Sequence, residues 1–317
     1  MNQNNPPCGQ VRHMDIVEDD AGQRLDNFLF RQLKNVPKSR IYRALRHGEV
    51  RVNKKRAKPD YRLQAGDLLR LPPLQMAETK KAPVADKWLT VVEQAILYED
   101  DNLIVVNKPS GLAVHGGSGL DYGLIEVLRK MRPLCRRLEL AHRLDRDTSG
   151  CTIVVKKAQV LREIHRQLRE KTLQKTYLAL VRGRWPRRRT LVDAPLEKNL
   201  LKSGERMVKV SESGKKSVTR FAIAELLPGA TLIQAMPITG RTHQIRVHAQ
   251  YAGFALLGDE KYAAREDLDW ARQQGLKRLF LHASEVVLHL PGNDQPLCVK
   301  AALPSELQGV LDNLRKG

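Results

Sequence analysis

The nonapeptide HRLDRDTSG, residues 142–150, places an acid between two bases. Asp145 stands between Arg143 and Arg146 in a chain that carries 55 Lys and Arg against 35 Asp and Glu. Neighbouring positive charge favours the ionised form of a carboxylate, and an ionised carboxylate can act as a nucleophile. The same pattern is also typical of an ion-pair cluster on a protein surface, so the rest of the chain must decide between the two interpretations.

A second segment, GRTHQIRVHAQYAG at 240–253, combines bases with the period of a helix. Thr242 can cap a helix that ends at Gly253. Four residues of this helix then share one face, namely Ile245, His248, Ala249 and Ala252. Arg246 falls on another part of the helix surface. From this segment alone, Arg241 and Arg246 are expected to be surface cations.

The residue types do not indicate a metal site or a familiar cofactor motif. The four cysteines form no C-x-x-C pair, and His243 and His248 are five residues apart rather than four. The glycine-rich HGGSG, residues 115–119, is not followed by G-K-[ST], and no G-x-S-x-G occurs. We therefore expect no metal and no nucleotide cofactor. We interpret HGGSG as a flexible turn whose backbone amides could meet an RNA phosphate.

The overall charge indicates a polyanionic partner. The 317 residues carry a formal net charge of +20 and give a sequence pI near 10.0, which favours nucleic acid. An anionic membrane is the alternative, but the sequence has neither a long apolar run nor a basic amphipathic anchor. The N-terminal MNQNNPPCGQVRH is polar and lacks the apolar core of an export signal. We therefore predict a cytoplasmic protein that does not contact membranes.

Half of the positive excess lies in residues 22–73, which hold fourteen Lys and Arg and four Asp and Glu. Apolar residues recur at helical spacing in RLDNFLFRQL and again in PKSRIYRALRHG. Ser39 can cap the second of these helices, and Gly48 can end it. EVRVNKK alternates as a strand does, and AGDLLRLP predicts another strand after a Gly66–Asp67 turn. The pattern predicts a small module of two helices and short strands.

Many of the module's cations would crowd its exposed side. The RNA-binding candidates among them are Arg40, Arg43, Arg46, Lys54, Lys55 and Arg56. A run of charge is most often only a solvated face. Here the acids that would neutralise such a face are almost absent, so we interpret the cations as a surface for RNA.

The chain is predicted to have four parts. They are an N-terminal tail (1–21), the basic module (22–73), a linker (74–88) and a second domain (89–317). Apolar runs in the second domain predict strands at 102–109, 151–157, 175–181, 217–225, 231–237, 285–290 and 297–300. A helix is predicted at 158–171. Strands and helices do not alternate regularly, so we predict an α+β fold in which helices and loops flank a mixed, mostly antiparallel sheet.

Both domains resemble known families. The basic module is similar to the S4 RNA-binding domain, through Arg24-Leu25-Asp26, Ser39-Arg40, Gly48, Val50-Arg51-Val52-Asn53 and Gly66-Asp67. In the second domain, AHRLDRDTSG, KTYLALV and GRTHQIRVHAQYAGFALLGDEKY resemble the RluA-type RNA pseudouridine synthases, whose larger members carry an S4 domain in front. The resemblance covers residues 22–300. It implies an isomerase that detaches uracil from C1′ of a uridine in RNA, turns it, and rejoins it through C5.

The resemblance also implies roles for individual residues. Asp145 matches the catalytic aspartate, and Arg246 matches the basic residue paired with it. Tyr177 matches the tyrosine that packs on the target base and is a candidate for the proton transfer. Arg143 matches the arginine that helps hold the RNA open around the flipped nucleotide. The remaining RNA-binding candidates of this domain are Arg146, Arg241 and His243. Two positions depart from the family's pattern, Ala255 for a frequent Pro and Ala263 for a common Gly, and they bear on local turns only.

The chemistry is consistent with this resemblance. A uridine must leave the base stack before its glycosidic bond can be reached, and basic and aromatic side chains offset the unstacking. Asp145 can then attack C1′ or C6, or help to remove the C2′ proton, and the residues do not choose among these routes. No redox step occurs, so no cofactor is needed.

The resemblance further suggests the RNA partner. The S4 segment and HGGSG are most similar to family members that modify several uridines of 23S ribosomal RNA, so we expect a monomer that acts on the large ribosomal subunit or its precursor. Three alternatives remain at this stage. They are a related synthase with other ribosomal RNA targets, a non-catalytic S4-type RNA-binding or ribosome-assembly factor, and a metal-dependent nuclease.

Overall fold

The computed structural model describes most of the chain. The described residues are 11–33, 36–73, 85–116, 122–135, 137–200 and 206–316. The first ten residues of the predicted tail, most of the predicted linker (74–84) and the last three residues of HGGSG lie outside them. The chain divides into two compact units, residues 1–82 and 83–317, which we call the N-terminal unit and the C-terminal unit. None of the described helices is long and apolar enough to cross a bilayer.

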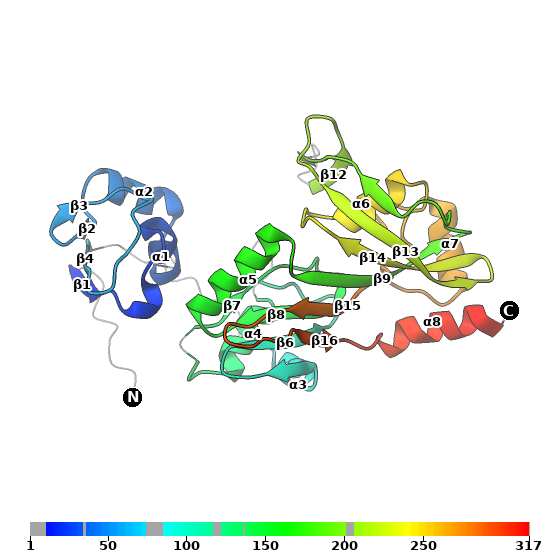
Figure 1. Cartoon of the computed structure of the whole chain (residues 1–317), viewed down its shortest axis with the longest axis horizontal. Coiled ribbons are helices and arrows are strands. Elements are labelled where there is room, and N and C mark those ends of the chain that lie inside the picture. Colours follow the sequence, from blue (N-terminus) through cyan, green and yellow to red (C-terminus); the bar gives the residue numbers. More distant parts are fainter. Residues whose placement is uncertain are drawn as a thin grey trace. The chain divides into compact units, whose positions relative to one another are not determined.

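The N-terminal unit is a small antiparallel sheet with two α-helices. Its elements are β1 (Arg12–Asp15), the 3-10 helix η1 (Glu18–Asp20), α1 (Leu25–Gln32), α2 (Lys38–Arg46), β2 (Arg51–Val52), β3 (Lys55–Arg56) and β4 (Leu68–Leu71), and the strand order is β1-β4-β2-β3 (Figure 1). Both predicted helices are confirmed, and their apolar faces form the core: Leu25, Phe28, Leu29, Ile41, Ala44 and Leu45 are buried. Strand β1 lies in the segment that the sequence assigned to a tail, and Met14 and Ile16 of that segment pack on this core.

The ends of α2 differ in part from the prediction. The helix begins at Lys38 with Pro37 as its N-cap, so the predicted capping role of Ser39 is wrong. The φ of Pro37 is −55°, which already suits the entry to a helix, and Ser39 therefore lies within the first turn. Gly48 follows the helix with a φ of +70°, the left-handed conformation typical of a helix end, as predicted.

A tight hairpin carries the lysines that follow β2. Asn53 and Lys54 have φ values of +48° and +65° and form the two-residue connection between β2 and β3. Two consecutive positive φ values are characteristic of a type I′ turn, which matches the twist of the strands it joins. The Asn53 side chain fixes the turn, because its amide donates to Asp67 Oδ1 (2.8 Å) and its Oδ1 accepts from Leu68 N–H (2.8 Å). Lys54, Lys55 and Arg56 are thereby held exposed at the tip.

The C-terminal unit is built on one large sheet. Its strands are β5 (Ile96–Glu99), β6 (Leu103–Lys108), β7 (Glu139–Leu140), β8 (Ser149–Val155), β9 (Gln174–Arg182), β10 (Leu191–Asp193), β13 (Val218–Leu227), β14 (Ala230–Pro237), β15 (Leu281–Leu288) and β16 (Leu297–Lys300). The order is β10-β13-β14-β9-β15-β8-β6-β5, with β16 beside β15 and β7 beside β8. Every pairing is antiparallel except that of β15 with β8. The predicted mostly antiparallel sheet is therefore confirmed.

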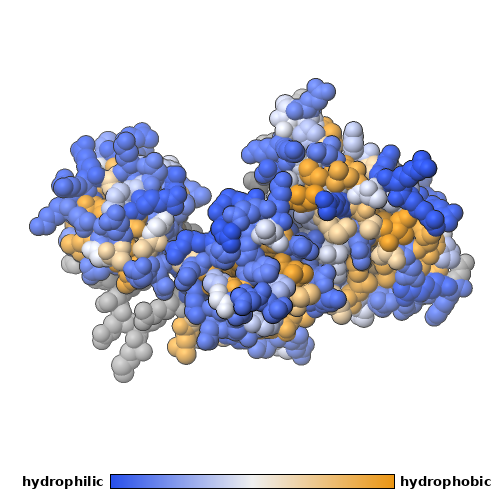
Figure 2. All heavy atoms as spheres, in the orientation of Figure 1, coloured by the Kyte–Doolittle hydropathy of each residue, from blue (hydrophilic) through white to orange (hydrophobic). Residues whose placement is uncertain are grey.

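Helices and one hairpin surround this sheet. They are α3 (Asp86–Gln94), α4 (Leu124–Met131), α5 (Ala158–Glu170), α6 (Gln244–Tyr251), α7 (Arg265–Gln273), α8 (Ser305–Lys316) and the hairpin β11 (Leu196–Leu200) with β12 (Arg206–Val210). Figure 1 shows α3 and α4 together beside β6, and α6 beside β13 and β14. Hydrophilic side chains cover much of the drawn face of each unit (Figure 2). The apolar residues of β8, β9, β14 and β15 lie mostly in the interior.

The parallel contact between β8 and β15 explains the glycine that ends HRLDRDTSG. Gly150 pairs with Ala283 and has a φ of +111°. A side chain there would place its Cβ 2.2 Å from the Ala283 carbonyl oxygen, so only glycine allows this approach. The loop that carries Asp145 thus runs directly into a central strand, two positions along the sheet from β9. A rigid sheet therefore positions the predicted site.

Candidate active site

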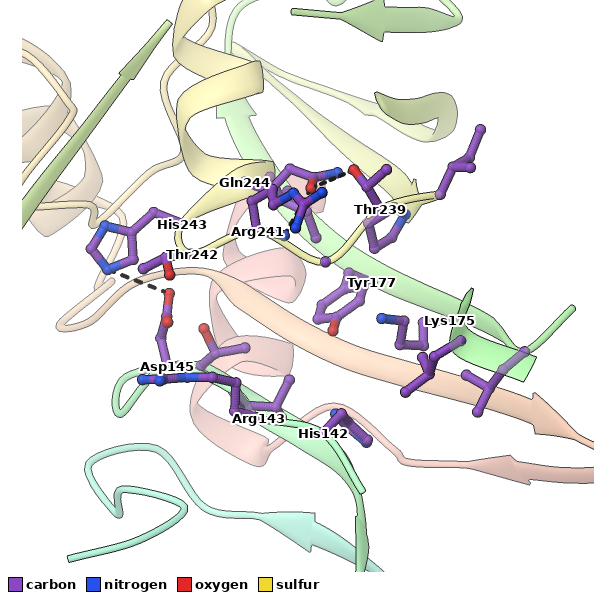
Figure 3. A pocket seen from close by; sticks show the side chains of 18 of the residues that line it. His142, Arg143, Asp145, Lys175, Tyr177, Thr239, Arg241, Thr242, His243 and Gln244 are labelled. Atoms are coloured by element: carbon purple, nitrogen blue, oxygen red, sulfur yellow. Dashed lines mark hydrogen bonds and ion pairs between the residues drawn. The ribbon is translucent and has the colours of Figure 1, made fainter. Parts of the chain in front are cut away.

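A cavity of about 510 Å³ lies in the C-terminal unit where several segments meet. The loop before β8, the start of β9 and the loop that leads into α6 carry the residues labelled in Figure 3, and the end of α5 with the residues after it lines the cavity as well. Six of the residues predicted from the sequence line it: Arg143, Asp145, Tyr177, Arg241, His243 and Arg246. Arg146 does not line it, and the predicted cations of the basic module belong to the N-terminal unit.

The polar partners of Asp145 come from α6 and from the residue that precedes this helix. Oδ2 of Asp145 lies 3.5 Å from Nη1 of Arg246 and 3.8 Å from Nε2 of His243. The sequence-based expectation that Arg143 and Arg146 are the charged partners of this carboxylate is therefore wrong. Arg146 is exposed and pairs instead with Asp147 (3.2 Å). Arg143 is exposed at the cavity and has no ion pair among the described residues, because sequence neighbours in an extended loop point in different directions.

Arg246 is held in place by a buried acid. Its Nε and Nη2 donate to the two carboxylate oxygens of Asp259 at 2.7 and 2.6 Å, and Asp259 is only 1 % exposed. The guanidinium also lies 5.0 Å from the centre of the Tyr262 ring. Burial alone would lower the pKa of Arg246, but its bonds to Asp259 outweigh burial and raise it. The bidentate pair fixes the plane of the guanidinium and leaves Nη1 for Asp145.

Helix α6 is more deeply buried than the sequence suggests. It starts at Gln244, and His243, in the left-handed conformation with a φ of +53°, is its N-cap, so the predicted cap at Thr242 is wrong. Gln244 instead fastens the preceding loop, because its Oε1 accepts from the Arg241 N–H (3.0 Å) and the Thr239 hydroxyl (2.7 Å). Six consecutive residues of the helix, 244–249, are buried. Arg246 is therefore not the surface cation expected from the helical period.

His243 faces Asp145 as a mostly desolvated imidazole. The hydroxyl of Tyr262 accepts from the Val208 N–H (3.0 Å) and lies 2.8 Å from Nδ1 of His243. Because that hydroxyl can donate its own proton to Nδ1, the arrangement favours a proton on Nε2, the nitrogen that faces Asp145. Burial lowers the pKa of His243, although the charge of Asp145 opposes this shift. A neutral His243 therefore offers Asp145 an N–H group rather than a full charge.

Tyr177 provides an aromatic surface inside the cavity. It lies on β9 and is 7 % exposed. Burial, and then the negative charge of Asp145, raise the pKa of its phenol. The hydroxyl therefore keeps its proton at neutral pH, so Tyr177 can donate a proton or a hydrogen bond but is not available as a phenolate base.

A buried lysine, which the sequence analysis missed, braces the loop of Asp145. Lys108 is 0 % exposed, and its Nζ donates to the carbonyl oxygens of Pro109 (2.9 Å), Leu112 (2.8 Å) and Arg146 (3.0 Å). Burial lowers the pKa of Lys108 to about 7, while the three carbonyls use all three N–H groups of its charged form. The sequence did contain a signal for this residue. Lys108 lies at the end of the apolar run NLIVVNKP, and a charged side chain inside a buried strand requires fixed hydrogen-bond partners.

Two other cavity residues were also missed. His142 is half-buried and its Nε2 accepts from the Ile153 N–H (3.2 Å). Burial, and then the charge of Lys175, lower the pKa of His142 to about 3, so its imidazole is neutral. Lys175 lies on β9 and points into the cavity near Tyr177 (Figure 3). Neither residue stands out in the sequence, because only the strand order brings them to the cavity.

The predicted cations of the N-terminal unit are exposed, with one exception. Arg43, Arg46, Lys54, Lys55 and Arg56 are exposed. Arg40 is half-buried and its Nη2 pairs with Glu49 at 2.7 Å. These side chains are therefore placed to contact an extended polyanion, not to line a pocket.

The described residues contain no group of three His, Cys, Asp or Glu that could hold a metal ion. The cavity offers carboxylate, imidazole, phenol, ammonium and guanidinium groups instead. Such groups bind anions and flat polar rings, and they transfer protons.

Comparison with known proteins agrees with this geometry. A family model described as RNA pseudouridylate synthase matches residues 102–251, and a model of the S4 domain matches residues 23–69. A protein from Pasteurella multocida called ribosomal large subunit pseudouridine synthase C is 55 % identical over 308 residues, which cover 96 % of this chain and 94 % of that protein. Its namesake from Escherichia coli is 54 % identical over 312 residues, covering 96 % and 97 %. The structure of human RNA pseudouridylate synthase domain containing 4 superposes with a TM-score of 0.60 at 25 % identity, covering 73 % of this chain and 96 % of the human one.

Proposed function

The chain belongs to the RNA pseudouridylate synthase family, and from this premise we propose that it converts specific uridines of large-subunit ribosomal RNA to pseudouridine. The observation that carries the proposal is the position of Asp145, which lines a cavity together with an aromatic ring and pairs with Arg246 at 3.5 Å. A carboxylate in that place would only repel the phosphates of a bound RNA if the protein were a simple RNA binder. It therefore favours an enzyme over the non-catalytic alternative.

The reaction is an isomerisation with a closed atom balance. The bond between C1′ and N1 breaks, a bond between C1′ and C5 forms, C5 loses a proton and N1 gains one. Asp145 is the only carboxylate that lines the described cavity, so we assign to it the attack on C1′ or C6, or the removal of the C2′ proton. Arg246 would hold that carboxylate in position, because Asp259 fixes the guanidinium from the other side.

The other cavity residues fit the handling of a flipped nucleotide. Tyr177 would pack against the uracil ring and, as a neutral phenol, could donate the proton that a departing base requires. Arg143 and Arg241 are exposed at the cavity, where their charges can contact phosphates beside the extruded nucleotide. His243 would keep Asp145 oriented through its Nε2.

The N-terminal unit would supply affinity for structured RNA. Its helix α2 and the β2–β3 hairpin present five of the predicted cations to solvent, and such side chains bind RNA mainly through phosphates and shape. The relatives named above act on the large ribosomal subunit, and their similarity over 96 % of the chain supports 23S ribosomal RNA as the substrate here. A monomer that works in the cytoplasm without a nucleotide cofactor is part of the same proposal.

A pseudouridine map of ribosomal RNA tests this proposal. We expect 23S RNA from a strain that lacks the protein to lose pseudouridine at a small set of positions. The wild-type gene should restore all of them, and a gene encoding Asp145→Asn should restore none. If 23S RNA from the deletion strain kept every pseudouridine, the proposed substrate would be wrong.

A further inference from the structure

Lys175 occupies the part of the cavity that the assignments above leave unused. It precedes Tyr177 by two residues on β9, so both side chains lie on the same face of the strand. Both line the cavity. In Figure 3 the Tyr177 ring lies between Asp145 and the Lys175 side chain, whose ammonium points toward the ring. A flat ligand packed on Tyr177 would therefore have Asp145 at one edge and Lys175 near another.

The ammonium of Lys175 has no hydrogen-bond or ion-pair partner among the residues that the structure describes. Two other desolvated cations of this unit differ from it, since Lys108 donates to three carbonyls and Arg246 is paired with Asp259. Burial lowers the pKa of Lys175. The neighbouring imidazole of His142 is neutral and already accepts a backbone N–H, so it does not compensate the charge. A desolvated cation without a partner costs free energy, which a ligand that brings an acceptor atom would recover.

We propose that the Lys175 ammonium donates a hydrogen bond to a ring carbonyl oxygen of the flipped uracil and stabilises the negative charge that develops there when the glycosidic bond breaks. This inference rests on the proposed function. With the ribose end of the nucleotide at Asp145 and the ring on Tyr177, the edge of the uracil that bears O4 is directed toward Lys175. The residue would thus select for uracil, because cytosine has a hydrogen-bond donor in place of O4.

The electron balance explains why a cation is useful at this edge on every route open to Asp145. If C1′ is attacked, or if the C2′ proton is removed, the electron pair of the C1′–N1 bond stays on N1 and is shared with O2 and O4. If C6 is attacked, the pair of the C5–C6 double bond moves to O4. In each case the C1′–N1 bond breaks, C5 bonds to C1′ and loses its proton, and N1 gains one. The Asp145–C1′ bond breaks as C5 takes its place, the Asp145–C6 bond breaks as C5 loses its proton, and on the third route the proton taken from C2′ returns to it. A fixed donor at a carbonyl oxygen stabilises the charged state more than the neutral substrate, which lowers the barrier.

The first test distinguishes a contact of Lys175 with the uracil from a contact with a phosphate, which is the other hydrogen-bond acceptor that RNA offers. We expect Lys175→Met to lower the single-turnover rate of pseudouridine formation on 23S RNA by about 10²-fold to 10³-fold. The dissociation constant for that RNA should stay within about threefold. A phosphate contact would instead raise the dissociation constant and leave the rate at saturating enzyme unchanged. Lys171→Met is the matched control, because Lys171 is an exposed lysine that lines the same cavity and should affect affinity only.

Two further variants separate the proposed contact from a structural role. Because Lys175→Met removes a desolvated charge without a partner, its melting temperature should equal or exceed that of the wild type. Lys175→Arg keeps a donor and should recover part of the rate. A lower melting temperature with no recovery in Lys175→Arg would assign Lys175 to the fold and overturn the proposal.

Substituted RNA identifies the contacted atom. Target uridines carrying sulfur in place of O4, or in place of O2, are compared with uridine in wild type and in Lys175→Met. We expect the rate ratio of one sulfur substitution to change by at least about tenfold between the two proteins, as coupled groups do in a double-mutant cycle. Ratios that are identical in both proteins for both atoms would overturn the proposal. A wild-type protein that formed no pseudouridine at all would instead contradict the proposed function.

Discussion

The two units use positive charge in opposite ways. In the N-terminal unit, Arg43, Arg46 and the cations at the hairpin tip are exposed. In the C-terminal unit, Lys108 and Arg246 are buried, and each is fixed by several hydrogen bonds. Exposed cations attract RNA at long range. Each contributes only a small part of the total electrostatic attraction, so the loss of one should have a small effect on binding. Buried cations hold the carboxylate of the proposed mechanism and its loop in position, so removal of a single partner should greatly slow the chemistry.

Among substitutions at the cations and their partners, the largest effect is expected from Asp259→Asn, which leaves Arg246 without its buried counter-charge. Breaking such a pair should lower the free energy of unfolding by about 3–5 kcal/mol. Misplacement of the guanidinium should lower the single-turnover rate at saturating RNA by at least about 10²-fold. Chemical denaturation and pseudouridine quantification measure the two effects.

The matched control for that variant is Asp267→Asn. Asp267 pairs with Arg182 at 3.1 Å, but the arginine side chain is 44 % exposed. Exposed pairs contribute about 0–1 kcal/mol, so both rate and stability should stay close to wild type. If Asp259→Asn and Asp267→Asn lost the same rate and the same free energy of unfolding, buried and exposed cations would not differ in the way proposed here.

A smaller loss is expected from Lys108→Met, which acts on the loop of Asp145. The variant leaves the carbonyls of Pro109, Leu112 and Arg146 without their donor. Only the Leu112 contact is fully buried, so water can replace the donor at the other two and the loss should be about 1–3 kcal/mol. The melting temperature and the rate should both fall. Lys55→Met, at an exposed lysine of the N-terminal unit, should change the free energy of unfolding by less than about 0.5 kcal/mol. An unchanged melting temperature in Lys108→Met would show that the lysine does not brace the loop.

Substitutions on α2 should affect RNA binding rather than the rate or the stability. Arg43→Ala combined with Arg46→Ala should weaken RNA binding and reduce the dependence of log K on log salt by about 0.7–0.9 for each phosphate that is no longer neutralised. The rate at saturating RNA should not change, because the residues to which the chemistry is assigned all belong to the C-terminal unit. Arg166→Ala is the control, since Arg166 is an exposed arginine already paired with Glu163 and Glu170. A lower saturating rate in the double variant would assign α2 a part in the chemistry.

The smallest expected effect is a change of stability with pH, which should differ between the two units. His282 is 0 % exposed in the C-terminal unit, and burial lowers its pKa to about 4, whereas His13 and His47 of the N-terminal unit are exposed. A histidine with a lowered folded pKa contributes full stability above its unfolded pKa of about 6.5 and loses it as the pH falls toward the folded value. Between about pH 6.5 and 4.5, the protection of backbone amides, calculated against the intrinsic exchange rate at each pH, should therefore fall more around β15 than in α2. His282→Gln should reduce this difference, and an equal fall in protection in both units would contradict the account.

Local patterns in the sequence predict most of the fold. The strands from β6 to β16 that were expected from apolar runs are present, and α1, α2 and α5 lie where the helical period places them. Such elements depend on neighbours a few residues away, which the sequence shows directly. The errors at Ser39 and Thr242 have a local cause as well, because Pro37 starts one helix earlier and Gln244 fixes the entry to the other.

The site is predicted less completely, because its contacts are distant in the chain. Arg246 meets Asp145 across 101 residues, and Lys108 reaches the Arg146 carbonyl across 38. Only the strand order of the sheet brings these groups together. Family resemblance supplied the pair of Asp145 and Arg246. Asp259 and Lys175 gave no local signal and were missed for this reason, whereas Lys108 was missed although its position in an apolar run was a local signal.

The central claim is that Asp145 carries the chemistry while other groups bind the RNA. The most direct measurement is pseudouridine formation on 23S RNA under single-turnover conditions by purified wild-type protein and by Asp145→Asn, with the dissociation constant measured in parallel. The account predicts no product from Asp145→Asn and a dissociation constant within about threefold of the wild type. Product formation by Asp145→Asn at the wild-type rate would contradict it.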